Sequence, residues 1–67
     1  MNHQETITAG GRAVVINQQG KGHVWANLYV NAHNGLEAAD ITTTHWKGKT
    51  LEGARNWAYK QLQEANQ

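Results

Sequence analysis

The sequence predicts a small α+β protein in which a three-stranded antiparallel sheet (strand order 1-2-3) is packed on one face by a C-terminal helix. Three observations support this two-layer βββα fold. Residues 23–32 alternate strictly between apolar and polar side chains, an Asn34-Gly35 pair follows them, and residues 51–65 repeat apolar side chains at spacings of three and four. The chain has 67 residues, which is enough for one domain.

Glycine marks the boundaries between the elements, because the chain has no proline. Gly10-Gly11 separates residues 1–11, expected to be a flexible N-terminal arm, from a single domain over residues 12–67. Two alternatives remain open for the arm: it adds an edge strand through Ile7, or it exchanges between subunits.

The first two strands are predicted from β-branched residues and from alternation. Residues 12–18 are rich in valine and isoleucine, which favours a strand. Residues 23–32 place five apolar side chains on one face, and the period of two is typical of a strand with one buried and one exposed side. The short Gly20-Lys21-Gly22 connection favours pairing of these two strands.

The third strand is predicted over residues 36–46 and is joined to the second through Asn34-Gly35. These two residues tolerate the positive φ angles of a two-residue primed turn. If they form the whole turn, Leu28 faces Ile41, and the apolar sides of both strands coincide. A slip of one residue would turn Ile41 to the other face.

The C-terminal helix is predicted to begin after Thr50, a plausible N-cap, with Glu52 in the first turn where the helix dipole favours an acid. Its apolar stripe is narrow and rich in alanine, which lets a helix approach a sheet closely. The stripe comprises Leu51, Ala54, Ala58, Leu62 and Ala65. Gly53 lowers the helix propensity by about 1 kcal/mol.

The sheet face opposite the helix has no partner within the predicted fold. It is expected to combine aromatic rings, amides and hydroxyls: Trp25, Asn27, Tyr29, Thr42, Thr44 and Trp46. Three interpretations are open. The side chains pack across the strands, they form a protein interface, or they contact nucleic acid by reading base edges or stacking on bases.

Basic residues are expected at the ends of this sheet, where phosphates would be met. They are Arg12, Lys21, Lys47 and Lys49. The overall balance is nearly neutral, with six basic and five acidic residues and a formal charge of +1. The central strands also lack arginine, the residue that most often contacts guanine.

Catalysis and metal binding find little support in the sequence. There is no cysteine, and the four histidines show no helical pair with metal-ligand spacing. Glycine spacings match neither nucleotide-binding motif, and Lys47-Gly48-Lys49-Thr50 lacks the upstream glycine of a phosphate loop. No cofactor, membrane span or signal peptide is expected, and the cytoplasm is the expected compartment.

The leading hypothesis is therefore a non-enzymatic binding module with a regulatory or accessory role. It would bind double-stranded DNA, or other nucleic acid, through the exposed sheet face. The alternative is a protein-interaction module, an inhibitor, an adaptor or a homodimer, that uses the same aromatic face.

Overall fold

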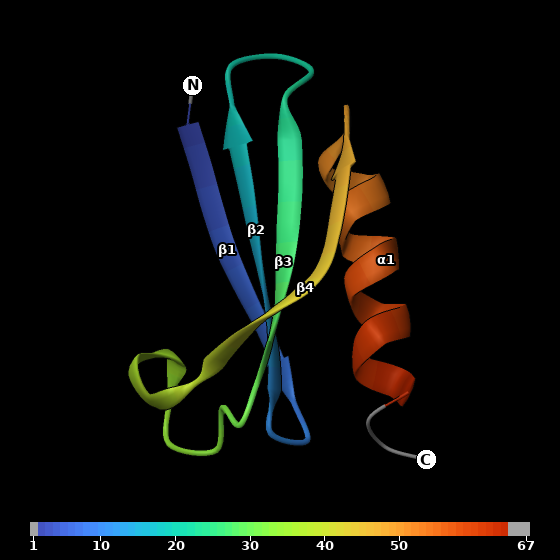
Figure 1. The fold of residues 1–67 in the computed structure, drawn as a ribbon. Coiled ribbons are helices and arrows are strands. Elements are labelled where there is room, and N and C mark those ends of the chain that lie inside the picture. Colours follow the sequence, from blue (N-terminus) through green and yellow to red (C-terminus); the bar gives the residue numbers. More distant parts are fainter. Residues whose placement is uncertain (1, 65–67) are drawn as a thin grey trace.

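The computed structural model describes residues 2–64, which form four antiparallel strands followed by one α-helix. The elements are β1 (Asn2–Ala9), β2 (Arg12–Gln19), β3 (Val24–Val30), η1 (Leu36–Ala38, a 3-10 helix), β4 (Asp40–Gly48) and α1 (Leu51–Glu64). The strands lie in the order β1-β2-β3-β4, and α1 runs along one side of the sheet (Figure 1). The predicted antiparallel sheet with one C-terminal helix is confirmed, but it has four strands and not three.

The additional strand is β1, in the segment that was expected to be a flexible arm. Gly10 and Gly11 form a two-residue hairpin turn between Ala9 and Arg12, with φ angles of 57° and 77°. Positive φ at both central residues is the geometry of a primed turn, whose twist matches that of the flanking strands. The structure thus agrees with the edge-strand alternative for residues 2–9, and Met1 lies outside the described residues.

The core lies between α1 and the even-numbered side chains of β2 and β3. Its fully or nearly fully buried members are Val14, Ile16, Val24, Ala26, Leu28, Ala54, Ala58 and Leu62. The small alanine side chains of α1 face the sheet, so the helix packs closely against the central strands. The predicted stripe is confirmed as far as Leu62, whereas Ala65 lies outside the described residues. Within residues 2–64, no helix has both the length and the apolar character needed to cross a membrane.

The start of α1 is fixed by a side-chain cap and by close packing of an aromatic ring. Thr50 Oγ1 accepts a hydrogen bond of 3.1 Å from the Gly53 amide, which confirms the predicted N-cap. A Cβ atom added to Gly53 would lie 3.0 Å from the Trp46 ring, and one added to Gly48 would collide with the same ring. The two glycines therefore make room for Trp46 between β4 and α1.

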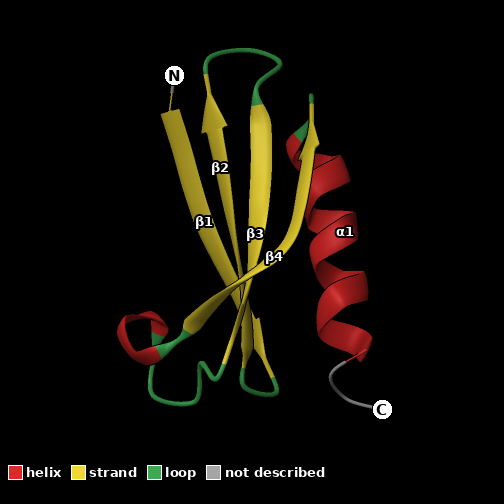
Figure 2. Ribbon diagram, viewed as in Figure 1, coloured by secondary structure: helices red, strands yellow, loops and turns green. Residues whose placement is uncertain are grey.

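The connection between β3 and β4 is longer than the predicted two-residue turn. It runs from residue 31 to residue 39, contains η1, and lies at the opposite end of the sheet from the β2–β3 turn (Figure 2). Asn31 adopts a positive φ of 58° immediately after β3, and Gly35 adopts 99°. The side-chain amide of Asn31 donates a hydrogen bond of 2.8 Å to Asp40, which joins the two ends of the loop.

This longer loop changes the register of β4. Tyr29 pairs with Ile41 and not with Asp40, and Trp25 pairs with Lys47 and not with Thr44. The displacements are one and three residues, and any odd displacement turns every side chain to the other face of a sheet. The predicted register of the hairpin is therefore wrong, and Ile41, which was expected in the core, is 61% exposed.

A bulge in β4 accounts for the difference between the two displacements. Between the Asn27–His45 and Tyr29–Ile41 pairs, β3 contributes one residue and β4 contributes three. Thr42 Oγ1 donates a hydrogen bond of 2.9 Å to the Leu28 carbonyl and accepts one of 3.1 Å from the Thr44 amide. The Thr42 hydroxyl thus replaces part of the backbone ladder that the bulge interrupts.

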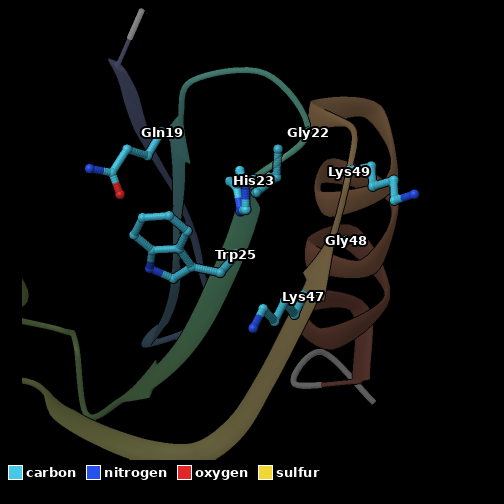
Figure 3. A pocket seen from close by; sticks show the side chains of 8 residues that line it. Gln19, Gly22, His23, Trp25, Lys47, Gly48 and Lys49 are labelled. Carbon is cyan, nitrogen blue, oxygen red and sulfur yellow. The ribbon is translucent and has the colours of Figure 1, made fainter.

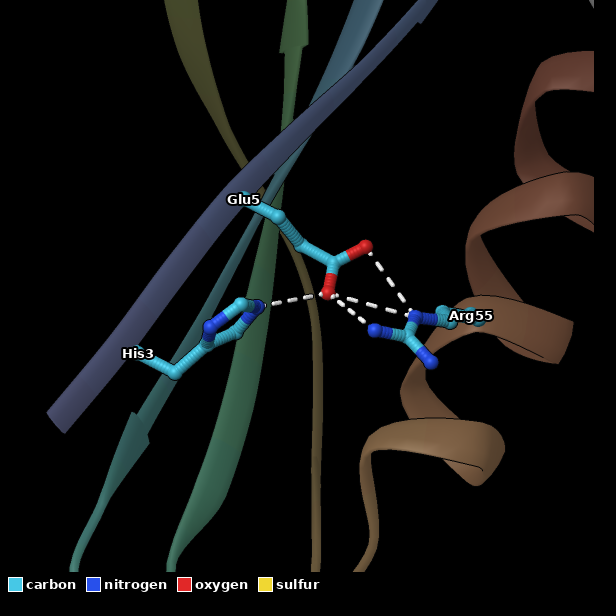
Figure 4. A network of polar contacts seen from close by, with 3 residues as sticks. All are labelled: His3, Glu5 and Arg55. Carbon is cyan, nitrogen blue, oxygen red and sulfur yellow. Dashed lines mark hydrogen bonds and ion pairs between the residues drawn. The ribbon is translucent and has the colours of Figure 1, made fainter. Parts of the chain in front are cut away.

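Strand β1 is tied to α1 by an ion pair. The Arg55 guanidinium donates to both carboxylate oxygens of Glu5 at 2.7–3.2 Å, and His3 Nε2 lies 2.9 Å from the same carboxylate (Figure 4). The hydrogen bond from Arg55 lowers the pKa of Glu5 below its ordinary value of 4.5, and the smaller contribution of His3 acts in the same direction, while partial burial opposes both.

Gly48→Ala is expected to destabilise the protein by about 1–3 kcal/mol, because the new methyl group would overlap the Trp46 ring. Urea denaturation measures this as a lower transition midpoint. Lys49→Ala, next to it in the sequence and exposed, is the control and should lie within about 0.5 kcal/mol of the wild type. Equal midpoints for the two variants would show that Trp46 does not pack on Gly48.

The ion pair predicts a pH-dependent contribution to stability. The pKa of Glu5 is lower in the folded state than in the unfolded state. The stabilisation by the ion pair is therefore fully present at pH values above about 4.5, and it is lost as the pH falls through the pKa of Glu5 in the folded protein. Arg55→Gln should therefore be less stable than the wild type at pH 7, and this difference should shrink at pH 3. Urea midpoints at both pH values test this, with Lys60→Gln as the control. A difference that persists unchanged at pH 3 would contradict it.

Candidate functional site

The face of the sheet turned away from α1, here called the open face, is centred on β3. Trp25, Asn27 and Tyr29 are all partly exposed on this face, while Val24, Ala26 and Leu28, which alternate with them, are buried. The alternation predicted from the sequence is therefore confirmed for β3. Its three polar and aromatic side chains form one line along a central strand.

The neighbouring side chains of β2 on the open face are buried, although α1 does not cover them. Ala13 pairs with Tyr29 and is fully buried, and Val15 pairs with Asn27 and is 8% exposed. Val15 is diagonal to both aromatic rings, within the reach of large side chains. Since α1 does not cover this face, part of the ring surface packs across the strands, and the remainder is exposed.

Amides and hydroxyls occupy the β1 side of the open face. Gln4 Nε2 donates a hydrogen bond of 3.0 Å to Asn17 Oδ1, and Asn17 pairs with Trp25 on the next strand. Thr6 and Thr8 continue the same row of β1 and are exposed. Trp25 is thus bordered on this side by neutral hydrogen-bonding groups.

On the β4 side, the open face carries residues that the predicted register had assigned elsewhere. Lys47 pairs with Trp25, His45 pairs with Asn27, and Ile41 pairs with Tyr29. Lys47 was predicted as a phosphate contact at the end of the sheet, and it lies directly beside the tryptophan. His45 and Ile41 were missed, because the two-residue turn placed both on the helix side.

Three residues predicted on the open face have other surroundings. Trp46 pairs with Ala26 and packs against the core between β4 and α1. The Thr42 hydroxyl is engaged within the bulge, and Thr44 donates its amide to that hydroxyl. Thr42 and Thr44 therefore do not pair with Asn27 and Trp25 as the sequence suggested, because β4 is displaced by an odd number of residues.

The charge on the open face is positive. The carboxylates within the described strands lie on the opposite face, since Glu5 pairs with Ile16 and Asp40 pairs with Val30. Lys47 is exposed on the open face without a carboxylate on the adjacent strand. An anionic partner would therefore meet a cation and neutral polar groups there.

The four predicted phosphate contacts divide between the two ends of the sheet. Lys21 lies in the β2–β3 turn, and Lys47 and Lys49 lie at the same end because Gly48 pairs with Val24 at the start of β3. Arg12 begins β2 beside the Gly10-Gly11 turn, at the other end. The structure thus places the three lysines at one end of the sheet and Arg12 at the other.

A groove of about 610 Å³ lies at the lysine-rich end, beside Trp25. Its lining includes Gln19, Gly22, His23, Trp25, Lys47 and Lys49. Figure 3 shows that the Trp25 ring points toward Gln19. The Lys47 side chain projects from β4 toward the side on which this ring lies, and the Lys49 side chain projects to the opposite side. The backbone here is closed by a hydrogen bond of 2.9 Å from the Gln19 amide to the His23 carbonyl.

Across the described part of the chain, no three His, Cys, Asp or Glu residues are grouped closely enough to hold a metal ion. His3 contacts Glu5 on the helix side, and His45 Nδ1 lies 2.9 Å from the Thr43 carbonyl. His23 is in the β2–β3 turn, and His33 packs on Gly11 at the far end of the sheet.

The fold and the site define a small α+β protein with a four-stranded antiparallel meander, one covering helix and one open, aromatic sheet face. Comparison with protein-family models, with curated proteins and with solved structures finds no significant match. Functional inference therefore depends on the side chains of the open face.

The register of β4 can be tested by disulfide formation, because the chain contains no cysteine. Asn27→Cys combined with His45→Cys should form an intramolecular disulfide on oxidation, since directly opposite residues have Cα atoms about 4.5–5.5 Å apart, within the range that disulfides bridge. Asn27→Cys with Thr42→Cys, the pair expected from a two-residue turn, should remain reduced. Non-reducing mass spectrometry of the monomer distinguishes them. The opposite pattern would contradict the observed register.

Proposed function

We propose that this protein binds nucleic acid through its open face, as a non-enzymatic module with a regulatory or accessory role. The observation that carries the proposal is the line of Trp25, Asn27 and Tyr29 on a central strand, beside Lys47 and with no strand carboxylate on the same face. Aromatic rings interact with bases, amides hydrogen-bond to base edges, and lysine meets phosphate.

The distribution of charge supports an anionic partner more strongly than the net charge does. A chain with a formal charge of +1 has little overall attraction for a polyanion. Here, however, Lys21, Lys47 and Lys49 gather at one end of the sheet, and the carboxylates of β1 and β4 point to the other face. The local field at the open face is therefore more positive than the composition indicates.

A binding role fits the shape of the site better than a catalytic role. General acid–base catalysis needs two titratable groups that converge on one substrate atom. On the open face, Lys47 and His45 lie on the same strand beside different residues of β3, and both are exposed.

A protein partner is the second candidate, and exposed Ile41 is the observation that favours it. Ile41 is 61% exposed beside Tyr29, and aromatic residues are enriched at protein interfaces. A homodimer formed through this end of the face would dissociate in an Ile41→Lys variant, which sedimentation velocity detects. The nucleic-acid proposal requires no such change in oligomeric state.

The dependence of binding on salt tests the proposal. Fluorescence anisotropy with a labelled mixed-sequence DNA, in duplex and single-stranded form, should show affinity that falls steeply as salt rises, because phosphate contacts release counterions. Replacing both Lys47 and Lys49 by alanine should reduce the logarithmic salt slope by about 1.4 to 1.8, the loss expected for two phosphate contacts.

Lys60→Ala is the matched control, because it removes an exposed lysine from α1 and not from the open face. This variant should keep the wild-type affinity and salt slope. Absence of binding to either form of DNA at low salt would refute the proposal and leave the protein-interaction module as the better candidate.

A further inference from the structure

We propose that the nucleic acid bound by the open face is an unpaired strand, with one base stacked on Trp25 and its phosphate beside Lys47 at the groove near the β2–β3 turn. This inference rests on the proposed function and specifies its ligand. The proposed ligand differs from the double-stranded DNA that the sequence led us to expect. The first reason for this change is that the sheet has a fourth strand.

The width of the sheet disfavours the major groove of a duplex. Four strands place the axes of β1 and β4 about 14 Å apart, from a spacing of about 4.8 Å between neighbours. The major groove of B-DNA is about 12 Å wide. The outer strands would therefore meet the phosphate walls before the residues of β3, a central strand, reached the base edges.

The position of the aromatic residues favours bases that present their faces. Trp25 and Tyr29 lie on a central strand and are partly exposed on the open face. In a duplex, the faces of the bases are covered by their neighbours in the stack, so the two rings would find only base edges. An unpaired strand exposes base faces, and stacking of this kind tolerates any base sequence.

The spacing along β3 matches several nucleotides. Trp25 and Tyr29 are four residues apart, which corresponds to about 13 Å along a strand. This exceeds the rise of about 3.4 Å between stacked bases in B-DNA, so the two rings would engage bases that are not adjacent. Asn27 lies between them and offers an amide to the edge of an intervening base.

The groove beside Trp25 offers a place for the phosphate of the nucleotide whose base stacks on this ring. Its volume of about 610 Å³ is within the range of small-molecule sites, and no carboxylate is among the residues that line it. Lys47 projects to the same side of β4 as the Trp25 ring, while Lys49 projects away (Figure 3). The geometry therefore assigns the main phosphate contact to Lys47 and a smaller one to Lys49.

The test compares a fluorescein-labelled single-stranded DNA 12-mer of mixed sequence with the same sequence as a duplex, at equal salt, by anisotropy. The single strand should bind at least tenfold more tightly. Trp25→Ala should weaken its binding by about 5- to 150-fold, the loss expected for one stacked base. Lys47→Ala should weaken binding more than Lys49→Ala.

Two further variants separate stacking from folding. Trp25→Phe keeps an aromatic ring and should stay within a few fold of the wild type, but it should lose the tryptophan quenching that the single strand causes. Tyr59→Ala is the matched control, because Tyr59 is a 52% exposed aromatic residue on α1, and its removal should leave affinity unchanged.

The outcomes distinguish this inference from the function on which it rests. Tighter, salt-dependent binding of the duplex would overturn the inference and leave the proposed function standing. Absence of binding to either DNA would overturn both. Quenching that persists in Trp25→Phe would also overturn the inference, because it would arise from a tryptophan other than Trp25.

Discussion

The packing of the Trp46 ring between β4 and α1 determines which residues of β4 reach the open face. The ring occupies space that Gly48 and Gly53 leave free, and it packs against the buried cluster of β2, β3 and α1. Because side chains alternate along a strand, packing Trp46 on the helix side turns Lys47 to the other side, next to Trp25. One large, partly buried side chain that packs against the core thus places the cation of the candidate site.

Much of the fold follows from local patterns in the sequence. The alternation in β3, the β-branched residues of β2, the capping threonine and the alanine stripe of α1 all predict elements that the structure contains. An edge strand through Ile7 was only an alternative prediction, because Gly10-Gly11 was interpreted as a boundary and not as a turn. The hairpin signal was present, since Gly-Gly supplies both positive φ angles, and Ile7 and Ala9 alternate with Thr6 and Thr8.

The candidate site was predicted on β3 but not on β4, for a physical reason. Burial alone fixes which side of β3 is open, whereas the partners on β4 depend on the length of the loop. Asn34-Gly35 satisfies the chemistry of a primed turn, but Asn31 leaves the strand earlier with its own positive φ, and residues 36–38 form a 3-10 helix. The apolar pattern of β4 did not reveal the longer loop, because its isoleucine, Ile41, remains exposed in the folded protein.

The bulge in β4 has a consequence for how the length of this strand can vary. Between the two flanking pairs, β3 advances by two residues and β4 by four. Both numbers are even, so the paired side chains point to the same face of the sheet before and after the bulge. Removal or addition of two residues around Thr43 would preserve the parity of the strand, and Lys47 and Ile41 would still point to the same side. A change of a single residue would invert one half of β4 relative to the other. This edge strand can therefore tolerate insertions and deletions of two residues, but not of one.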